Sequence, residues 1–136
     1  MKMQDSNLNL LTSRIIEAAI SVHTELGPGL LESVYSAAMV IELGLMGIDA
    51  KSEISVPVFY RGNKIADDGF RMDLLVEDTI IVEMKSVDII KPVHKKQLLT
   101  YLKLSHKPLG LLINFNNRLL KDGIVRIVNS PHGDVT

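Results

Sequence analysis

The chain has 136 residues, 46% of them hydrophobic, and its 15 basic and 16 acidic residues give a formal net charge of −1. This length fits one domain, residues 1–136, and the near-neutral charge excludes a globally basic nucleic-acid-binding domain, so any such binding must come from a local patch. The absence of cysteine excludes disulfides, thiolate metal sites and cysteine nucleophiles, and it leaves oxygen-ligated metals open.

The first part of the chain is predicted to form a helical hairpin. Apolar residues recur at helical spacing from Leu8 to Leu26, where Gly27 ends the pattern, and a second helical pattern runs from about Leu30 to Leu45. The segment "MKMQDSNLNL" is too polar for a secretory leader, and no apolar run is long enough to span a membrane. We therefore expect a cytoplasmic protein.

Strand-like sequence follows Ala50. The segments "EISVPVFY" and "KIADDGFRMDLLVEDTIIVEMKSV" predict three or four antiparallel strands, with a turn at residues 61–63. Because proline cannot donate a ladder hydrogen bond, Pro57 places the first of these strands at an edge or in a bulge.

A crossover helix and two more strands complete the predicted order. Pro92 suits the first turn of a helix that ends at about Ser105; "LGLLINF" reads as a buried strand, and "GIVRIV" as a last strand before a polar tail at about residues 129–136. This order predicts an α/β domain with a mixed central sheet flanked by helices, in which the crossover helix can deliver a strand parallel to an earlier one.

The stretch "TIIVEMKSV" carries two charges inside an otherwise apolar strand. Side chains alternate along a strand, so Ile81, Glu83 and Lys85 share one face. Burial of such charges is unfavourable unless they have partners. A simple ion pair between Glu83 and Lys85 on a solvent-facing strand is one explanation.

The turn before this strand offers a second explanation. A two-residue loop would set Asp73 opposite Val82, whereas a three-residue loop pairs Val76 with Ile80 and sets Asp73 opposite Glu83. We favour the second register, or a longer loop or bulge with the same parity, because it brings two carboxylates within about 5 Å of each other at their Cβ atoms. A divalent cation such as Mg²⁺ or Mn²⁺ would remove the repulsion between them.

The spacing of Asp73 and "EMK" resembles the Asp…(Asp/Glu)-x-Lys signature of the PD-(D/E)XK nuclease superfamily, although Met72 stands where the superfamily name has proline. The segment Gly29 to Tyr35, "GLLESVY", is similar to the motif of the small bacterial GxxExxY proteins within it. The segments "KQLLTYL" and "LGLLINFNN" also match that family, in the same order along nearly the whole chain. The resemblance implies a restriction-endonuclease-like core in αβββαβ order, preceded here by the helical hairpin.

The same resemblance implies a metal-dependent nuclease that hydrolyses phosphodiester bonds of DNA or RNA with Mg²⁺ or Mn²⁺. It assigns Asp73, Glu83 and the backbone carbonyl of Met84 as metal ligands. Glu32 would reach the metal directly or through water, and Lys85 would lie beside the attacking water or the phosphate.

Residues on two helices are expected to complete the site. The resemblance places Gln97 beside the catalytic centre, gives Tyr101 contact with substrate and makes Tyr35 a supporting residue. Lysines of the same basic region are candidates for phosphate contacts that carry no sequence specificity, namely Lys91, Lys95 and Lys96.

Two other function classes stay open at this point. One is a nucleic-acid-binding or regulatory module that keeps a nuclease fold with little activity. The other is a structural or interaction protein, such as one half of a homodimer, in which the charged strand is an ion-pair network.

Overall fold

Two helices open the computed structural model, which describes residues 5–130. Helix α1 spans Asp5–Leu26 and helix α2 spans Glu32–Leu45, so the predicted helical hairpin is confirmed with boundaries shifted by a few residues. Gly27 ends α1 with a left-handed backbone, φ 73°, which glycine adopts without steric conflict.

The five strands form one mixed sheet in the order β1-β2-β3-β4-β5. Strand β4 lies parallel to β3, across the crossover helix α3, and the other neighbours are antiparallel, so the predicted mixed α/β sheet is confirmed. The remaining elements are β1 Ala50–Tyr60, β2 Asn63–Val76, β3 Ile80–Lys85, α3 Pro92–Ser105, β4 Leu109–Asn114, a short 3-10 helix Leu120–Gly123 and β5 Ile124–Val128.

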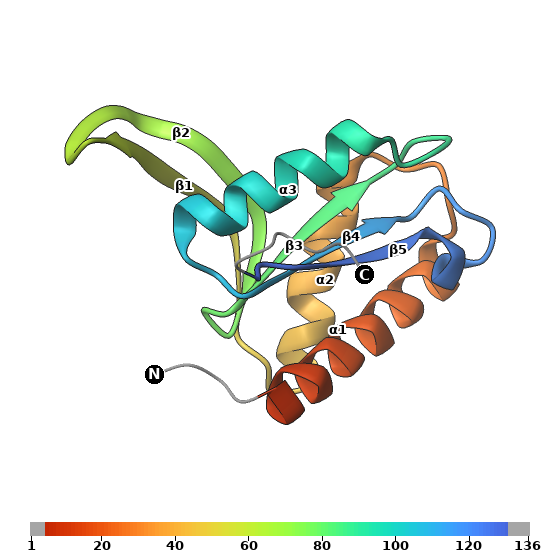
Figure 1. The fold of residues 1–136 in the computed structure, drawn as a ribbon. Coiled ribbons are helices and arrows are strands. Elements are labelled where there is room, and N and C mark those ends of the chain that lie inside the picture. Colours follow the sequence, from red (N-terminus) through yellow and green to blue (C-terminus); the bar gives the residue numbers. More distant parts are fainter. Residues whose placement is uncertain (1–4, 131–136) are drawn as a thin grey trace.

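Helices cover both faces of the sheet (Figure 1). On the face of α1 and α2, Tyr35 and Met39 are buried together with Val82 and Met84. On the face of α3 the buried cluster includes Ile81 of β3. The alternation of β3 between these two clusters agrees with the predicted sharing of faces along this strand.

Strand β1 lies at the edge of the sheet, and its register with β2 shifts between Val56 and Val58. Both alternatives expected from Pro57 are therefore confirmed, because the missing N–H falls at an edge and at an irregularity. Beyond this point the β1–β2 hairpin projects away from the body of the domain (Figure 1).

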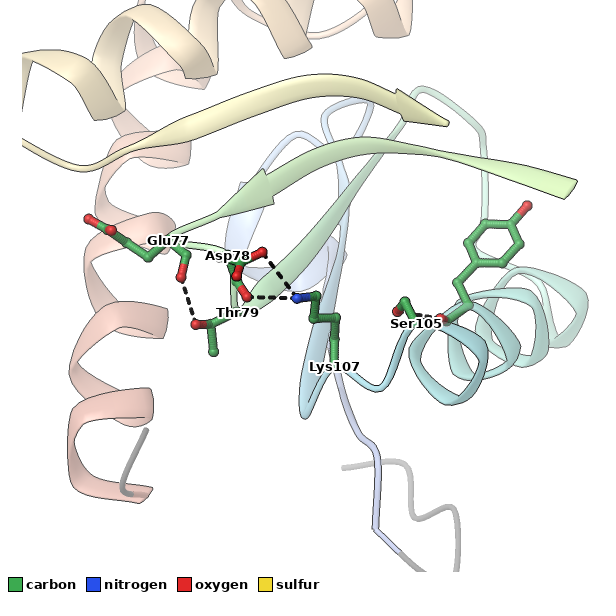
Figure 2. A network of polar contacts seen from close by, with 6 residues as sticks. Glu77, Asp78, Thr79, Ser105 and Lys107 are labelled. Carbon is green, nitrogen blue, oxygen red and sulfur yellow. Dashed lines mark hydrogen bonds and ion pairs between the residues drawn. The ribbon is translucent and has the colours of Figure 1, made fainter. Parts of the chain in front are cut away.

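The β2–β3 turn sets the register on which the site depends. Val76 pairs with Ile80 across a three-residue loop, as predicted. Lys107 donates from Nζ to the carbonyl and the carboxylate of Asp78 at 3.0 and 3.1 Å, and Thr79 Oγ1 donates to the Glu77 carbonyl at 2.7 Å (Figure 2). The Lys107 contacts tie the turn to the segment that precedes β4. Continued by one residue from the Leu74–Val82 pair, the register brings Asp73 level with Glu83.

Of the predicted polar tail, Asn129 and Ser130 are described, and residues 131–136 lie outside the described part of the chain. Asn129 is held by a bond from its N–H to the Pro108 carbonyl at 2.9 Å and by its side-chain amide, which donates to the Leu102 and Lys107 carbonyls. Within residues 5–130 no helix combines the length and the apolar character needed to cross a membrane.

Candidate active site

Glu83 is a buried carboxylic acid in the middle of β3. The residue is 6% exposed, and its Oε1 has no hydrogen-bond partner among the described residues. Burial, followed by the neighbouring Asp73 carboxylate, raises the pKa of Glu83 to about 9, against a smaller opposite effect of Lys85. The charge of Lys85 therefore does not compensate for burial, and the neutral form of Glu83 is favoured in the folded chain.

Asp73 contacts the same strand through its side chain. The paired residues of β2 and β3 end at Leu74 and Val82. Two residues beyond Val82, the Met84 N–H donates to Asp73 Oδ2 at 3.0 Å, so a carboxylate replaces the backbone carbonyl that a regular ladder would supply. Since the N–H and C=O of one strand residue point to the same side, the Met84 carbonyl lies on the side of Asp73.

Strand β2 does not alternate regularly at Asp73, although its register is the predicted one. Met72 belongs to the buried cluster under α3, whereas Leu74 belongs to the cluster under α1 and α2. Two residues of the same parity thus lie on opposite faces, and β2 changes face at Asp73. The register sets Asp73 opposite Glu83, and the change of face accompanies the contact of the Asp73 carboxylate with the Met84 N–H.

Glu32, the first residue of α2, joins the site from the other side of β3. Its Oε2 accepts a hydrogen bond from the Ser86 N–H at 3.0 Å, next to Lys85. A hollow of about 420 Å³ is shared by Glu32, Glu53 and Asp73, with Ser33, Ser36, Ala37 and Ser52 completing its lining. No group of three or more His, Asp or Glu side chains within residues 5–130 is arranged to hold one ion, so Glu32 lies beside the carboxylate pair and is not a preformed third ligand.

The donor set at the pair suits a hard divalent cation. Glu83 has a buried oxygen without a partner, and the neighbouring Asp73 carboxylate lies on the side to which the Met84 carbonyl points. Mg²⁺ and Mn²⁺ take oxygen ligands, commonly one or two carboxylates with water and phosphate in the other positions. The residues present therefore fit the ion that the sequence implies.

Tyr101 of α3 lies within electrostatic reach of both carboxylates. Burial, followed by the charges of Glu83 and Asp73, raises the pKa of its hydroxyl. Its ring stacks on Phe70 of β2 with centroids 4.3 Å apart, which fixes α3 against the base of the hairpin.

The other predicted residues of α3 are less closely tied to the pair. Gln97 is exposed one turn before Tyr101, on the same flank of the helix. Lys91 and Lys96 are exposed and Lys95 is half-buried at the N-terminal end of α3. The side chains of Gln97, Lys95 and Lys96 make no hydrogen bond or ion pair with other described residues.

Tyr35 supports the loop that leads into Glu32. It is fully buried and stacks on Phe115 with centroids 4.3 Å apart. Its hydroxyl donates to the Gly27 carbonyl at 2.6 Å and accepts from the Leu30 N–H at 3.1 Å. Both ends of the "GPG" segment are thereby fastened to one buried side chain.

Asn114 is a site residue that the sequence did not lead us to assign. It is 1% exposed, its Oδ1 accepts from the Val87 N–H at 3.1 Å, and its Nδ2 donates to the Val87 carbonyl at 2.8 Å. The Phe115 N–H donates to the Lys85 carbonyl at 2.9 Å. The segment that follows Glu83 is thus fixed by β4. The available signal was one amide at the end of an otherwise wholly apolar strand.

A family model described as the PD-(D/E)XK nuclease superfamily matches residues 9–127. No curated protein and no solved structure matches the chain significantly. The matched range contains the carboxylate pair, Lys85 and all of the helices and strands that position them except the ends of α1 and β5. With its five-stranded mixed sheet flanked by helices, the chain belongs to the PD-(D/E)XK nuclease superfamily and has its restriction-endonuclease-like fold.

Proposed function

We propose that the protein is a metal-dependent nuclease that hydrolyses phosphodiester bonds of DNA or RNA, with Mg²⁺ or Mn²⁺ held by Asp73, Glu83 and the Met84 carbonyl. The observation that carries this proposal is the buried Glu83 oxygen without a partner beside a second carboxylate. When bound, such an ion supplies an activated water and stabilises negative charge on the phosphate. A purely structural role gives no reason to bury Glu83 beside a second carboxylate.

The remaining residues act around this pair. Lys85 follows Glu83 on the same face of β3, and its ammonium can stabilise charge on the scissile phosphate or orient the attacking water. Glu32, fastened to the Ser86 N–H, can reach the ion through a bridging water. Gln97 and Tyr101 extend the site onto α3, where Tyr101 would contact substrate.

We also assign the chain to the GxxExxY group within the superfamily. The support is the segment Gly29 to Tyr35, in which the glutamate contacts Ser86 and the tyrosine fastens the preceding loop. In this assignment the glutamate and the tyrosine of the motif both serve the geometry of the site.

A cleavage assay with matched variants tests the nuclease activity. Single- and double-stranded DNA and RNA are incubated with Mg²⁺ or Mn²⁺, and with EDTA. We expect cleavage that requires the ion and that falls by at least about a hundredfold in Asp73→Asn, Glu83→Gln and Lys85→Ala. Asp67→Asn, a change of an exposed acid on the same strand β2, should cleave like the wild type. Cleavage that survives Glu83→Gln and Lys85→Ala would overturn the proposal.

Crystals soaked in Mn²⁺ provide an independent test, because anomalous density between Asp73 and Glu83 does not require the right substrate.

A nucleic-acid-binding module with little activity is the second candidate, favoured by the convergence of only two carboxylates in the described chain. It predicts nucleic-acid binding that is insensitive to EDTA, with no cleavage product on any of the four polymers.

A further inference from the structure

Glu53 has a left-handed backbone, with φ 53°, inside strand β1. Residues with a side chain rarely adopt this region, and glutamate lacks the short polar group that helps Asn and Asp to do so. The other non-glycine residues with positive φ in the described chain are Arg61, Glu77, Asp78 and His106, and all of them lie in turns or at a helix end. Glu53 is thus the one such residue of the described chain placed within a strand.

This conformation coincides with the place where β1 and β2 both change face. Ser52 pairs with Leu74 and Ile54 pairs with Met72, so Glu53 faces Asp73 with no residue inserted on either strand. Beyond Glu53, toward the hairpin tip, Ile54 packs in the cluster under α3 together with Met72. Before it, Ala50 packs in the cluster under α1 and α2, as Leu74 does.

The change of face determines what Asp73 can reach. A regular β2 would continue its backbone ladder to Met84, and the Asp73 side chain would stand perpendicular to the sheet. Here the backbone pairing stops at Leu74, and Asp73 Oδ2 takes the Met84 N–H. The carboxylate therefore lies in the gap between the two strands, beside Glu83.

We propose that the left-handed backbone of Glu53 positions Asp73 for metal binding. The inference rests on the proposed function, since Asp73 and Glu83 are metal ligands only within it. Glu53 is a positioning residue, because its own side chain is exposed and acts through the turn of two paired strands. Strained backbone of this kind persists where the surrounding structure enforces it, and it is concentrated at functional sites.

Substitutions that differ only in their tolerance of positive φ test this proposal on the full chain. Glu53→Gly and Glu53→Asn permit the left-handed backbone, whereas Glu53→Ala disfavours it and the β-branched Glu53→Val disfavours it most. Two readouts are used. One is the Mn²⁺ dissociation constant from calorimetry, and the other is hydrogen exchange of the Met84 amide in the metal-free protein, followed by NMR.

We expect Glu53→Gly and Glu53→Asn to bind Mn²⁺ with a dissociation constant within about twofold of the wild type. Glu53→Val should bind at least about tenfold more weakly, which is the loss commonly seen when residues that support metal ligands are removed. The Met84 amide should lose protection in Glu53→Val and keep it in Glu53→Gly. Ser55→Val, a β-branched change on the same strand without positive φ, should leave both readouts unchanged.

Wild-type affinity and wild-type amide protection in Glu53→Val would overturn the proposal. Equal losses in Glu53→Gly and Glu53→Val would also overturn it, because they would place the role in the carboxylate. If Glu53→Val does not fold, the comparison of Glu53→Ala with Glu53→Gly decides in the same way. If the wild-type chain binds no Mn²⁺, the proposed function is contradicted. Hydrogen exchange of the Met84 amide then still shows whether the backbone of Glu53 positions Asp73.

Discussion

Glu83 makes the stability of the metal-free protein depend on pH. Its pKa is raised to about 9 in the folded chain from an ordinary value of 4.5. Between these values the folded state keeps a proton that the unfolded chain releases. The proton bound to Glu83 therefore contributes fully to the free energy of unfolding below pH 4.5, and this contribution is lost as pH rises toward about 9.

We predict that the free energy of unfolding in EDTA falls between about pH 5 and pH 9 with a slope of up to about 1.4 kcal/mol per pH unit. Urea denaturation at several pH values measures this slope. In Glu83→Gln the slope from this group should vanish, because the amide does not titrate. Parallel profiles for the two proteins would contradict a buried, protonated Glu83.

The same proton should be displaced by the metal. An ion held by Asp73 and Glu83 requires both carboxylates ionised, so Mn²⁺ binding should release about one proton near neutral pH and become tighter as pH rises. Calorimetry in two buffers with different ionisation enthalpies counts the released protons. Asp73→Asn should abolish binding, and Asp67→Asn should leave both affinity and proton release unchanged. Binding without proton release would place the ion away from Glu83.

At the scale of elements, one buried amide joins β4 to the segment after β3. We call the two hydrogen bonds between the Asn114 side chain and the Val87 backbone the Asn114 clamp. Asn114→Ala leaves the Val87 N–H and carbonyl without their partners, which should lower stability by about 1 to 3 kcal/mol. Because the clamp fixes the segment directly after Lys85, the cleavage rate should fall further than instability explains at a temperature where the variant is fully folded. Denaturation curves and single-turnover cleavage on the same samples separate the two effects.

Asn116→Ala is the matched control for this clamp, because Asn116 bonds to Asn114 only through its backbone N–H. It should retain both stability and rate. A variant Asn114→Ala that is less stable but cleaves at the wild-type rate would show that the clamp serves the fold alone.

The elements differ in how far sequence could predict them. The β2–β3 register was chosen between two loop lengths because one of them sets Asp73 opposite Glu83. The irregularity at Pro57 followed from its missing N–H. Both signals are local. The change of face at Asp73 was missed, since the left-handed residue that accompanies it is a glutamate and carries no turn signal. The contact of Glu32 with Ser86 joins residues far apart in sequence, and no periodic pattern encodes such a bond.

At the scale of the whole molecule, substrate attraction must overcome an unfavourable charge distribution. The net charge is −1, and Glu32 and Asp73 bring carboxylates to the candidate site. These carboxylates would repel an approaching phosphate when no ion is bound. We propose that lysines at the N-terminal end of α3 supply compensating positive charge, namely Lys91, Lys95 and Lys96.

The salt dependence of binding measures this contribution. With Glu83→Gln as the background, so that cleavage does not interfere, fluorescence anisotropy gives the affinity for labelled DNA and RNA at several salt concentrations. Each phosphate that the protein no longer neutralises should reduce the slope of log K against log[salt] by about 0.9 for duplex DNA and about 0.7 for single strands. We predict that the triple change Lys91→Ala, Lys95→Ala, Lys96→Ala lowers the slope by the equivalent of about one to three phosphates, equally for unrelated sequences.

Lys121→Ala is the matched control, because this exposed lysine lies on the short 3-10 helix before β5 and not on α3. Its slope should equal that of the background. If the triple variant instead keeps the slope and loses affinity only for particular sequences, α3 reads bases and does not merely hold phosphates. If neither slope nor affinity changes, the nucleic acid approaches the carboxylate pair from the side of α2, across the hollow shared by Glu32 and Asp73.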